Sequence, residues 1–339
     1  MAYTTIKKPS DYFNTKLYAG NSGTQSITGV GFQPDFLWIK RRTAAGDHNL
    51  VDVIRTSDKT LISNSNGTEY SNATITSFDS DGFSLSGSDG ALNASSSDYA
   101  SWNWKANGAG SSNTDGSITS TVSANTTSGF SIVSYTGTGA NATVGHGIGS
   151  APKMIIIKDR DSTQSWSIYN KNIGYGNFLN LDNSNASASS TTRFTADPSS
   201  SVFSIGTNGS GNGSGNNFIA YCFADVKGFS KFGSYICNGN ADGTFVYTGF
   251  KPAFVMTKET SDTSSWGMWD NKRLGYNPDQ KRIQAEDSAA ESSTGSLDLL
   301  SNGFKLTSAS GSLNTSGNTF IYMAFAEEPL VGDNPCTAR

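Results

Sequence analysis

Three stretches of the chain repeat one another, and this repetition constrains the fold more than any single motif. Each begins with a proline, continues as an apolar run and ends in lysine: residues 34–40 (PDFLWIK), 152–158 (PKMIIIK) and 252–258 (PAFVMTK). Because the prolines stand at positions 34, 152 and 252, the period is about 100 to 118 residues. A propeller blade takes about 40–50 residues and a solenoid coil fewer, whereas one antiparallel sandwich takes about 100. The spacing therefore predicts small β-sandwich domains in tandem.

The similarity continues through each repeat. Fourteen residues after the three prolines come His48, Trp166 and Trp266. Each repeat then closes with an apolar run, at residues 99–105, 218–224 and 320–326. Large and small side chains alternate in these closing runs, as in a strand with one face toward a core. The first runs are apolar throughout, which indicates strands covered on both faces. We predict an all-β chain of three tandem antiparallel β-sandwich repeats, each enclosing its own core like domains on a string.

The repeats set the domain boundaries. We expect an N-terminal arm at 1–13, repeats at 14–106, 117–227 and 228–328, a linker at 107–116 and a polar C-terminal tail at 329–339. The linker is rich in Gly, Ser and Asn, a composition typical of flexible coil. The arm is expected to dock on the first domain or on a neighbour. Residues 280–293 look helical by propensity, but their equivalents at 60–63 and 178–181 look like strand, so we predict strand at 282–285.

Charge and hydropathy exclude several classes of protein. The net charge is −4 and no basic stripe is present, which argues against nucleic-acid binding. No apolar run approaches the roughly 20 residues that span a bilayer, and the first residues lack the apolar region of a secretory signal. We expect a chain that is made without export and does not insert into a membrane. Three cysteines without metal-ligand spacing predict no disulfides, a buried Cys222 and an exposed Cys336.

The search for catalytic residues is negative. The glycine-rich string at 211–215 (GNGSG) is expected to be a hairpin loop and not a nucleophile elbow, because its counterparts in the other repeats do not keep the glycines. Asp79 with Asp81, and Glu286 with Asp287, are the nearest pairs of carboxylates for sugar hydrolysis. Asp79 and Asp81 stand beside Gly82, where turn formation explains them. Asp159 and Asp161 form an incomplete calcium loop. We predict no catalytic residue, no metal and no cofactor.

Aromatic pairs provide the one candidate ligand site. Trp166 with Tyr169, and Trp266 with Trp269, alternate as a strand would. Either all four rings pack inside the protein, or one ring of each pair reaches the surface and offers a platform for a sugar. The repeated lysines, Lys40, Lys158 and Lys258, are expected to mark the exposed ends of buried strands. Nine Asn-x-Ser/Thr triplets (Asn66, Asn72, Asn93, Asn125, Asn141, Asn185, Asn208, Asn212 and Asn314) reflect composition and not glycosylation.

Three segments carry a resemblance to a known family. These are residues 3–18 (YTTIKKPSDYFNTKLY), 31–40 (GFQPDFLWIK) and 320–329 (FIYMAFAEEP). They resemble repeat proteins of marine tailed phages, of the cyanophage and pelagiphage kind. The resemblance covers nearly the whole chain and implies jelly-roll, concanavalin-A-like domains of virion or tail-fibre proteins. It implies no catalytic residue.

The expected function follows from the resemblance. We expect a non-enzymatic virion structural protein, a tail fibre or tail-associated appendage that takes part in host attachment, with host-surface glycans as a candidate ligand. The expected partners are other virion proteins of the tail or capsid and further copies of the chain, a trimer among the candidate states. Assembly in the host cytoplasm and residence in the virion follow. A capsid decoration or head-fibre protein is the first alternative, and a polysaccharide-degrading enzyme is the second.

Overall fold

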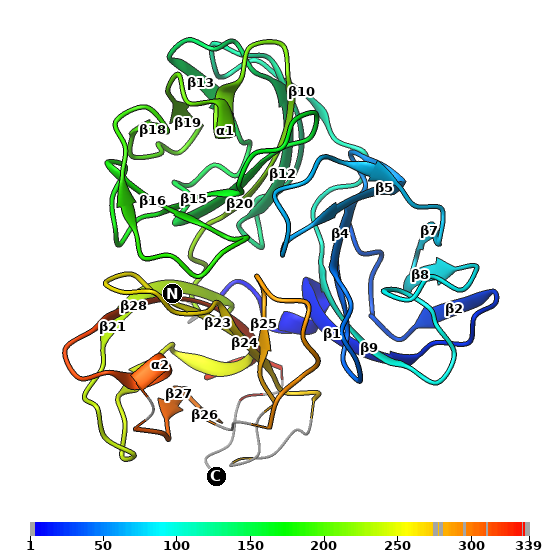
Figure 1. Cartoon of the computed structure of the whole chain (residues 1–339), viewed down its shortest axis with the longest axis vertical. Coiled ribbons are helices and arrows are strands. Elements are labelled where there is room, and N and C mark those ends of the chain that lie inside the picture. The colour runs from blue at the N-terminus through cyan, green and yellow to red at the C-terminus, as the bar shows by residue number, and fades with distance from the viewer. Residues whose placement is uncertain are drawn as a thin grey trace.

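The protein is built from β-strands arranged as three lobes around a common centre (Figure 1). The computed structural model describes residues 4–273, 277, 281–293, 296–309, 311–333 and 335. Within these residues the named strands form six sheets, and every pair of neighbouring strands in them runs antiparallel. The predicted all-β, antiparallel fold is therefore confirmed. No helix in the described part of the chain is long and apolar enough to cross a membrane.

The first unit follows a short 3-10 turn, η1 (Pro9–Asp11). Its larger sheet has the strand order β1-β9-β3-β4-β5-β6, and a smaller sheet has the order β2-β8-β7. The strands are β1 (Phe13–Ala19), β2 (Gln25–Thr28), β3 (Phe36–Arg41), β4 (His48–Asp52), β5 (Thr56–Ile62), β6 (Tyr70–Ser71), β7 (Ile75–Asp79), β8 (Gly82–Leu85) and β9 (Asp98–Trp104).

The second unit has the same plan with two further strands at one edge. Its sheets have the orders β10-β11-β12-β20-β14-β15-β16-β17 and β13-β19-β18. The elements are β10 (Ser111–Asn113), β11 (Ser120–Asn125), β12 (Phe130–Thr136), β13 (Ala142–Gly145), β14 (Met154–Asp159), β15 (Ser167–Asn170), β16 (Asn177–Asn180), β17 (Ala188–Ser189), β18 (Phe194–Ala196), β19 (Val202–Ile205), α1 (Gly209–Asn212) and β20 (Asn217–Phe223).

The third unit has sheets with the orders β21-β28-β23-β24-β25 and β22-β27-β26. The elements are β21 (Ser230–Ile236), β22 (Phe245–Tyr247), β23 (Phe250–Glu259), β24 (Gly267–Asp270), β25 (Ile283–Gln284), β26 (Leu297–Leu300), β27 (Gly303–Leu306), α2 (Gly311–Asn314) and β28 (Thr319–Pro329).

The repeated sequence segments take equivalent places in the three larger sheets. Phe36 pairs with Trp104, Met154 with Phe223, and Phe254 with Phe325, in each case between the first apolar strand and the closing strand. The segment at 281–285 also follows the repeat: β25 pairs with β24, and no helix forms there. Pairing in the sheet thus overrides the local helical propensity.

The continuous apolar strands are buried on both faces because each larger sheet has a core on both sides. One face closes a sandwich core of its own unit, and each of the three units has such a core. The other face belongs to a single central cluster, to which Phe36, Met154 and Phe254 all contribute. Ring contacts join the units across this centre: Phe36 stacks on Tyr221 at 4.1 Å between centroids, and Phe223 meets Phe325 at 6.0 Å.

This central core corrects the expectation of separate domains on a string. Trp104 of the first unit also contacts Phe254 of the third, with ring centroids 6.0 Å apart. All three pairs of units are therefore in direct contact. Aromatic rings bury large apolar areas, so the inner faces of the three sheets are more stable together than exposed to water.

The connecting segments also differ from a flexible chain. Part of the expected linker forms strand β10, which pairs with β11, and the Asn107 N–H donates to the Ser123 hydroxyl at 2.8 Å. The N-terminal arm docks on the third unit, since Ile6 is buried in the central core and the Phe13 ring stacks on Phe325 at 5.0 Å. Strand β28 extends to the start of the expected tail. Cys336 lies outside the described residues, so its expected exposure stays a prediction.

Candidate functional site

The four aromatic residues predicted as a ligand platform do not form one. Trp166, Tyr169, Trp266 and Trp269 are all buried. Trp166 and Trp266 belong to the central core, whereas Tyr169 and Trp269 lie in the sandwich cores of the second and third units. The surface alternative is wrong because both faces of these strands are covered by other sheets. The rings alternate as predicted, but one face packs inside the unit and the other packs against the neighbouring unit.

The two core tryptophans join neighbouring units by hydrogen bonds. The Trp166 indole N–H donates to the carbonyls of Ile62 and Ser65 in the first unit, at 2.9 and 3.1 Å. The Trp266 indole N–H donates to the carbonyl of Asn180 in the second unit at 2.9 Å. Ile62 and Asn180 hold equivalent places in their sheets. Ile62 pairs with the residue that follows His48, and Asn180 pairs with the residue that follows Trp166. The second unit thus contacts the first as the third contacts the second.

His48 takes the corresponding position in the first unit. Its Nδ1 accepts a hydrogen bond from the Trp38 indole N–H at 2.9 Å, so the proton of the neutral ring lies on Nε2. Burial, followed by the positive charge of Lys40, holds the pKa of His48 well below its usual value. A neutral histidine with an Nε2–H therefore replaces the indole N–H of the other two units.

The three repeated lysines are buried, contrary to the prediction that they mark exposed strand ends. Burial lowers the pKa of Lys40, Lys158 and Lys258 to about 8 in each case. Their ammonium groups donate to main-chain carbonyls. Lys40 bonds to Ser288 of the third unit at 3.1 Å, and Lys258 bonds to Ser184 of the second unit at 3.2 Å. These two lysines mark the places where neighbouring units meet, and carbonyl oxygens replace the water they would have at a surface.

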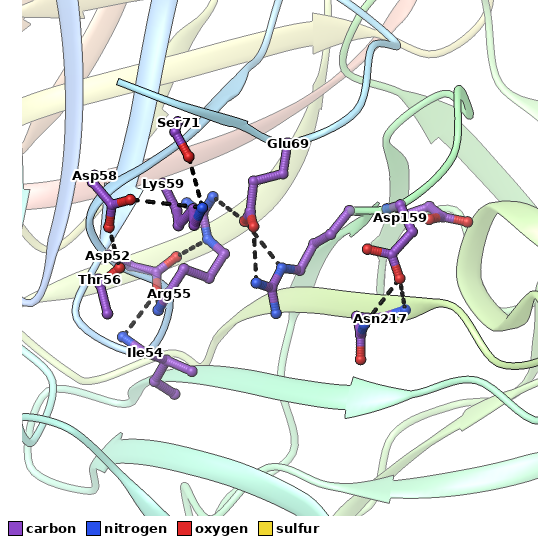
Figure 2. A network of polar contacts seen from close by, with 12 residues as sticks. Asp52, Ile54, Arg55, Thr56, Asp58, Lys59, Glu69, Ser71, Asp159 and Asn217 are labelled. Atoms are coloured by element: carbon purple, nitrogen blue, oxygen red, sulfur yellow. Dashed lines mark hydrogen bonds and ion pairs between the residues drawn. The ribbon is translucent and has the colours of Figure 1, made fainter. Parts of the chain in front are cut away.

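A buried ion pair lies between the first and second units (Figure 2). The Arg55 Nε donates to the Asp52 carboxylate at 2.6 Å, and both side chains are fully buried. The Tyr221 hydroxyl, from the closing strand of the second unit, donates to the same carboxylate at 2.8 Å. The Arg55 guanidinium in turn donates to the Tyr221 oxygen at 3.0 Å. Each charge therefore has several partners, as a buried ion pair requires.

The same arrangement recurs between the third and first units. The Arg273 Nε donates to the Asp270 carboxylate at 2.6 Å, and the Trp102 indole N–H donates to it at 3.0 Å. Trp102 and Tyr221 hold equivalent places, two residues before the end of their closing strands. Burial by itself raises the pKa of Asp270, but the charge and hydrogen bonds of Arg273 outweigh it and leave the pKa below its usual value.

The second unit carries a neutral version of this pair. Asn170 stands where the others have aspartate, and Ile173 stands where they have arginine. The equivalent residue of the third unit's closing strand is Met323, whose thioether has no hydrogen to donate. A carboxylate at position 170 would receive no hydrogen bond from Met323. An uncharged amide, that of Asn170, stands at this position instead. A buried carboxylate is therefore present only at the two sites where the closing strand of the neighbouring unit supplies a hydrogen-bond donor.

A further set of contacts runs around the outside of the three interfaces. Main-chain N–H groups of Glu69, Ser187 and Glu291 donate to the carbonyls of Arg160, Thr260 and Arg42, at 2.9, 3.0 and 3.0 Å. Two of these pairs add a bidentate ion pair, Glu69 with Arg160 and Glu291 with Arg42. The first unit thus contacts the second, the second contacts the third, and the third contacts the first. Such head-to-tail interfaces make a closed ring with pseudo-threefold symmetry.

Glu69 also links this outer contact to the buried pair. It accepts from Arg160 at 2.9 and 3.0 Å and from Arg55 at 3.1 Å, as the dashed lines of Figure 2 indicate for Arg55. Burial raises its pKa, but the two guanidinium groups outweigh this effect and the pKa of Glu69 is lowered. The charged form of Glu69 is therefore part of the interface.

The other sequence candidates have structural roles. Asp79 accepts from the hydroxyls of Ser77 and Ser84 at 2.7 and 2.6 Å, and Asp81 accepts from the N–H groups of Gly29 and Gly31 at 2.9 and 2.7 Å. Those two N–H bonds lower the pKa of Asp81. A general acid for sugar hydrolysis needs a raised pKa instead.

The remaining candidates are loop and core residues. Asp159 accepts from Ser162 and Asn216 at 2.7 and 2.8 Å. The glycine-rich string at 211–215 begins inside α1, a single helical turn, and is not only a hairpin loop. Cys222 is buried, as predicted, and burial raises the pKa of its thiol. Among the residues that the structure describes, no three His, Cys, Asp or Glu side chains gather as a metal site would require.

Three of the Asn-x-Ser/Thr triplets mark a structural residue that sequence reasoning missed. Asn93, Asn212 and Asn314 are each fully buried shortly before the closing strand, and Asn212 and Asn314 are the last residues of α1 and α2. Their amide groups donate to two main-chain carbonyls each, such as Gly23 and Gly87 for Asn93, both at 2.8 Å. Their equivalent spacing before the closing runs was the available signal.

Two surface grooves lie at equivalent edges of two units. The groove of the first unit, of about 400 Å³, lies between β1 and Gly29, next to β2. The groove of the third unit, of about 610 Å³, lies between β21 and β22 and is lined by Lys231 and Tyr247. At the same place in the second unit, β11 pairs with β12 and covers the edge. These open edges are the candidate interaction sites of the protein.

The comparison with known families gives one match. A model of a domain of unknown function (DUF7483) matches residues 8–329. No curated protein gives a significant match. The matched region runs from just before η1 to the end of β28, so it includes all three units and the ring that they close. The protein belongs to the DUF7483 family.

Proposed function

We propose that the protein is a non-enzymatic structural component of a phage particle, placed at the tail as a fibre or appendage that takes part in host attachment. The observation that carries the proposal is the ring of three sandwiches closed within one chain. Closed rings formed by head-to-tail interfaces are a usual way of building symmetric assemblies. Here the three units of one chain take the three positions of such a ring. A single chain therefore suits a site with threefold symmetry in a larger particle.

The sandwich architecture supports a display role. The sheets are held rigidly by the central core, and the loops between strands lie at the outside of the lobes (Figure 1). Loops on a rigid scaffold are the usual place for recognition residues. Several copies on one particle would convert weak contacts into useful avidity. A host glycan, if bound, has to use such outer surfaces, because the four predicted aromatic residues are buried.

The alternatives make different demands on the same structure. A capsid decoration or head-fibre protein would use the ring to bind coat proteins. A polysaccharide-degrading enzyme would need one carboxyl group held in its protonated form. The pKa of Asp81 is lowered, and Glu286, whose pKa burial raises, accepts a hydrogen bond from the main-chain N–H of the core residue Trp266 at 3.0 Å.

Immunogold electron microscopy of the phage particles tests the proposal. Antibody raised against the full chain is expected to label the tails of intact particles. Label on the heads would support the capsid alternative instead. Particles without label, in a preparation where a known virion protein is labelled, would overturn the proposed role in the virion. The expected homo-oligomer is checked by sedimentation equilibrium of the purified chain.

A further inference from the structure

The third unit closes the outer side of its edge strand, β21, with a carboxylate. Asp225, in the segment before this strand, accepts a hydrogen bond from the Phe232 N–H at 2.8 Å. Burial raises the pKa of Asp225, whereas the bond from Phe232 and the charges of Lys153 and Lys231 lower it. The outward main-chain N–H of this strand is therefore a place where a carboxylate binds, and lysines nearby favour its charged form.

The chain enters the first edge strand, β1, by the same turn as it enters β21. The Tyr12 N–H donates to the Pro9 carbonyl, and the Phe229 N–H donates to the Val226 carbonyl, each at 2.9 Å. The position before this turn holds Lys8 in the first unit, where the third unit has aspartate. The first unit therefore has no carboxylate at this position.

The N–H that such a carboxylate would bind in the first unit belongs to Thr15. In an antiparallel pair, alternate residues of an edge strand direct their main-chain groups away from the neighbouring strand. Tyr12 bonds inward, since its carbonyl accepts from the Lys105 N–H at 2.9 Å, so the N–H of Thr15, three residues later, lies on the outer side. Within the described part of the chain this N–H has no acceptor, and the buried hydroxyl of Thr15 also has no partner. Buried polar groups are ordinarily hydrogen-bonded, so Thr15 marks a place for an acceptor that the chain does not supply.

The groove beside Thr15 carries positive charge. It has a volume of about 400 Å³ and is lined by Lys16 of the first unit and Lys272 of the third. Within the residues that the structure describes, neither ammonium has an ion-pair partner. The charge of Lys16 acts on Asp81, but that carboxylate already accepts from two main-chain N–H groups. The groove therefore offers two cations and the free donors of Thr15 to an anionic group.

We propose that this groove binds an acidic saccharide through a carboxylate of the sugar. The carboxylate accepts from the Thr15 N–H, as Asp225 does from its own edge strand, and the two ammonium groups neutralise its charge. Hydrogen-bonding and charged groups form most of the lining, with Leu17 as an apolar side chain, which suits a hydroxylated ring. The volume lies within the range of about 300–1,000 Å³ for small-ligand sites. This inference rests on the proposed role in host attachment and gives the host glycan a chemical class.

Short oligomers of galacturonate and of mannuronate, each with its methyl ester, test the site. Acid and ester have the same sugar rings, but the ester has no carboxylate. Isothermal titration calorimetry with the full chain is expected to show saturable binding of an acid oligomer that weakens as salt is raised. The esters are expected not to bind saturably. A short peptide of aspartate is the third ligand, and tighter binding of this peptide would show that the groove takes an acidic protein segment, which would contradict the saccharide.

Substitutions at position 8 show where the carboxylate lies. Lys8→Asp supplies a carboxylate at the position where the third unit has one, so it is expected to fill the groove and abolish binding. Lys8→Ala removes the same ammonium without supplying a carboxylate, and it should change the affinity less than about twofold, because the charge it removes is exposed and screened by salt. The Lys8 side chain is 62% exposed, so both variants are expected to fold, and circular dichroism checks this.

Further variants and one spectroscopic signal separate this site from the third unit. Lys16→Met and Lys272→Met should each weaken binding about 1.4- to 5-fold, as the loss of an exposed ion pair does, whereas Lys231→Met should leave it unchanged. In TROSY NMR spectra the amide proton of Thr15 should move to lower field when the acid oligomer is added.

Three results would overturn the inference. These are no saturable binding of either acid oligomer, binding of an ester as tight as that of its acid, or equal binding by the Lys8→Asp and Lys8→Ala variants. All three are measured on the purified chain and do not depend on the immunogold labelling. A failure of this site is therefore distinguishable from a failure of the proposed role in the virion.

Discussion

The Tyr221 hydroxyl of the second unit donates a 2.8 Å hydrogen bond to the Asp52 carboxylate of the first, although the two residues lie far apart in the sequence. Both side chains are fully buried. This bond joins two β-sandwiches through a charged group that no water reaches. The contacts of the pseudo-threefold ring are therefore part of the folded core, and their loss should be measurable as stability.

Removing the Tyr221 hydroxyl should destabilise the whole protein. The Tyr221→Phe variant leaves the buried carboxylate of Asp52 without one donor, and hydrogen bonds to charged groups contribute about 1.5–3 kcal/mol. Tyr135→Phe is the matched control, because Tyr135 is also buried but donates to a neutral carbonyl, that of Gly211. Its loss should be about 0.5–1.5 kcal/mol. Urea denaturation of both variants compares the free energies of unfolding, and an equal or smaller loss for Tyr221→Phe would contradict this account.

The buried ion pair of the first unit should tolerate removal of both charges better than removal of one. Arg55→Ile leaves Asp52 as an unpaired buried charge, which costs about 3–5 kcal/mol. The double variant Asp52→Asn/Arg55→Ile copies the Asn170 and Ile173 of the second unit, and it should recover part of that loss. Denaturation of the single and double variants gives the coupling energy. A double variant that loses the sum of the two single losses would show that the pair is not coupled.

The three buried lysines predict a rise in stability with pH. Their pKa in the folded protein is about 8, below the usual lysine value of about 10.4, so the unfolded state binds more protons between these two values. The free energy of unfolding therefore increases as pH rises through 8, by about 1 kcal/mol per lysine up to pH 9.

The pH range of this experiment is limited by other groups. Burial raises the pKa of the Cys222 thiol and of several tyrosines, so their titration in the unfolded state opposes the rise at higher pH. Unfolding is best measured between about pH 7 and 9 with a reductant present. Lys158→Met should reduce the rise by about a third, because one of three such lysines is removed. A stability that is flat or falls over this range, with no difference in the variant, would count against buried charged lysines.

The repeats could be read from the sequence, but the ring could not. The prolines at 34, 152 and 252 and the closing runs predicted the strands and their antiparallel pairing, because hydrophobic pattern and period act locally. The uniform apolar runs also indicated coverage on both faces. They did not indicate that the second face of each sheet is covered by another unit. The sequence of an apolar face does not show which surface packs against it.

The same limit explains the residues that were misinterpreted. Trp166 and Trp269 were candidates for a surface platform because a ring that alternates with a core residue ordinarily faces water in a lone sandwich. Lys40 was expected to be exposed because lysine is almost never buried without partners. In both cases the neighbouring unit supplies the apolar contacts or the carbonyl oxygens. Asn93 was overlooked because an amide that bonds to loop carbonyls resembles any other polar residue in a sequence rich in Asn.

Differential scanning calorimetry of the full chain tests most directly whether the three units form one body. Because the central core is shared by all three, no unit can unfold without exposing the inner faces of the other two, and we predict a single transition. The van't Hoff enthalpy should then equal the calorimetric enthalpy. Separate transitions, or a calorimetric enthalpy about three times the van't Hoff value, would show three independently folded domains and contradict the shared core.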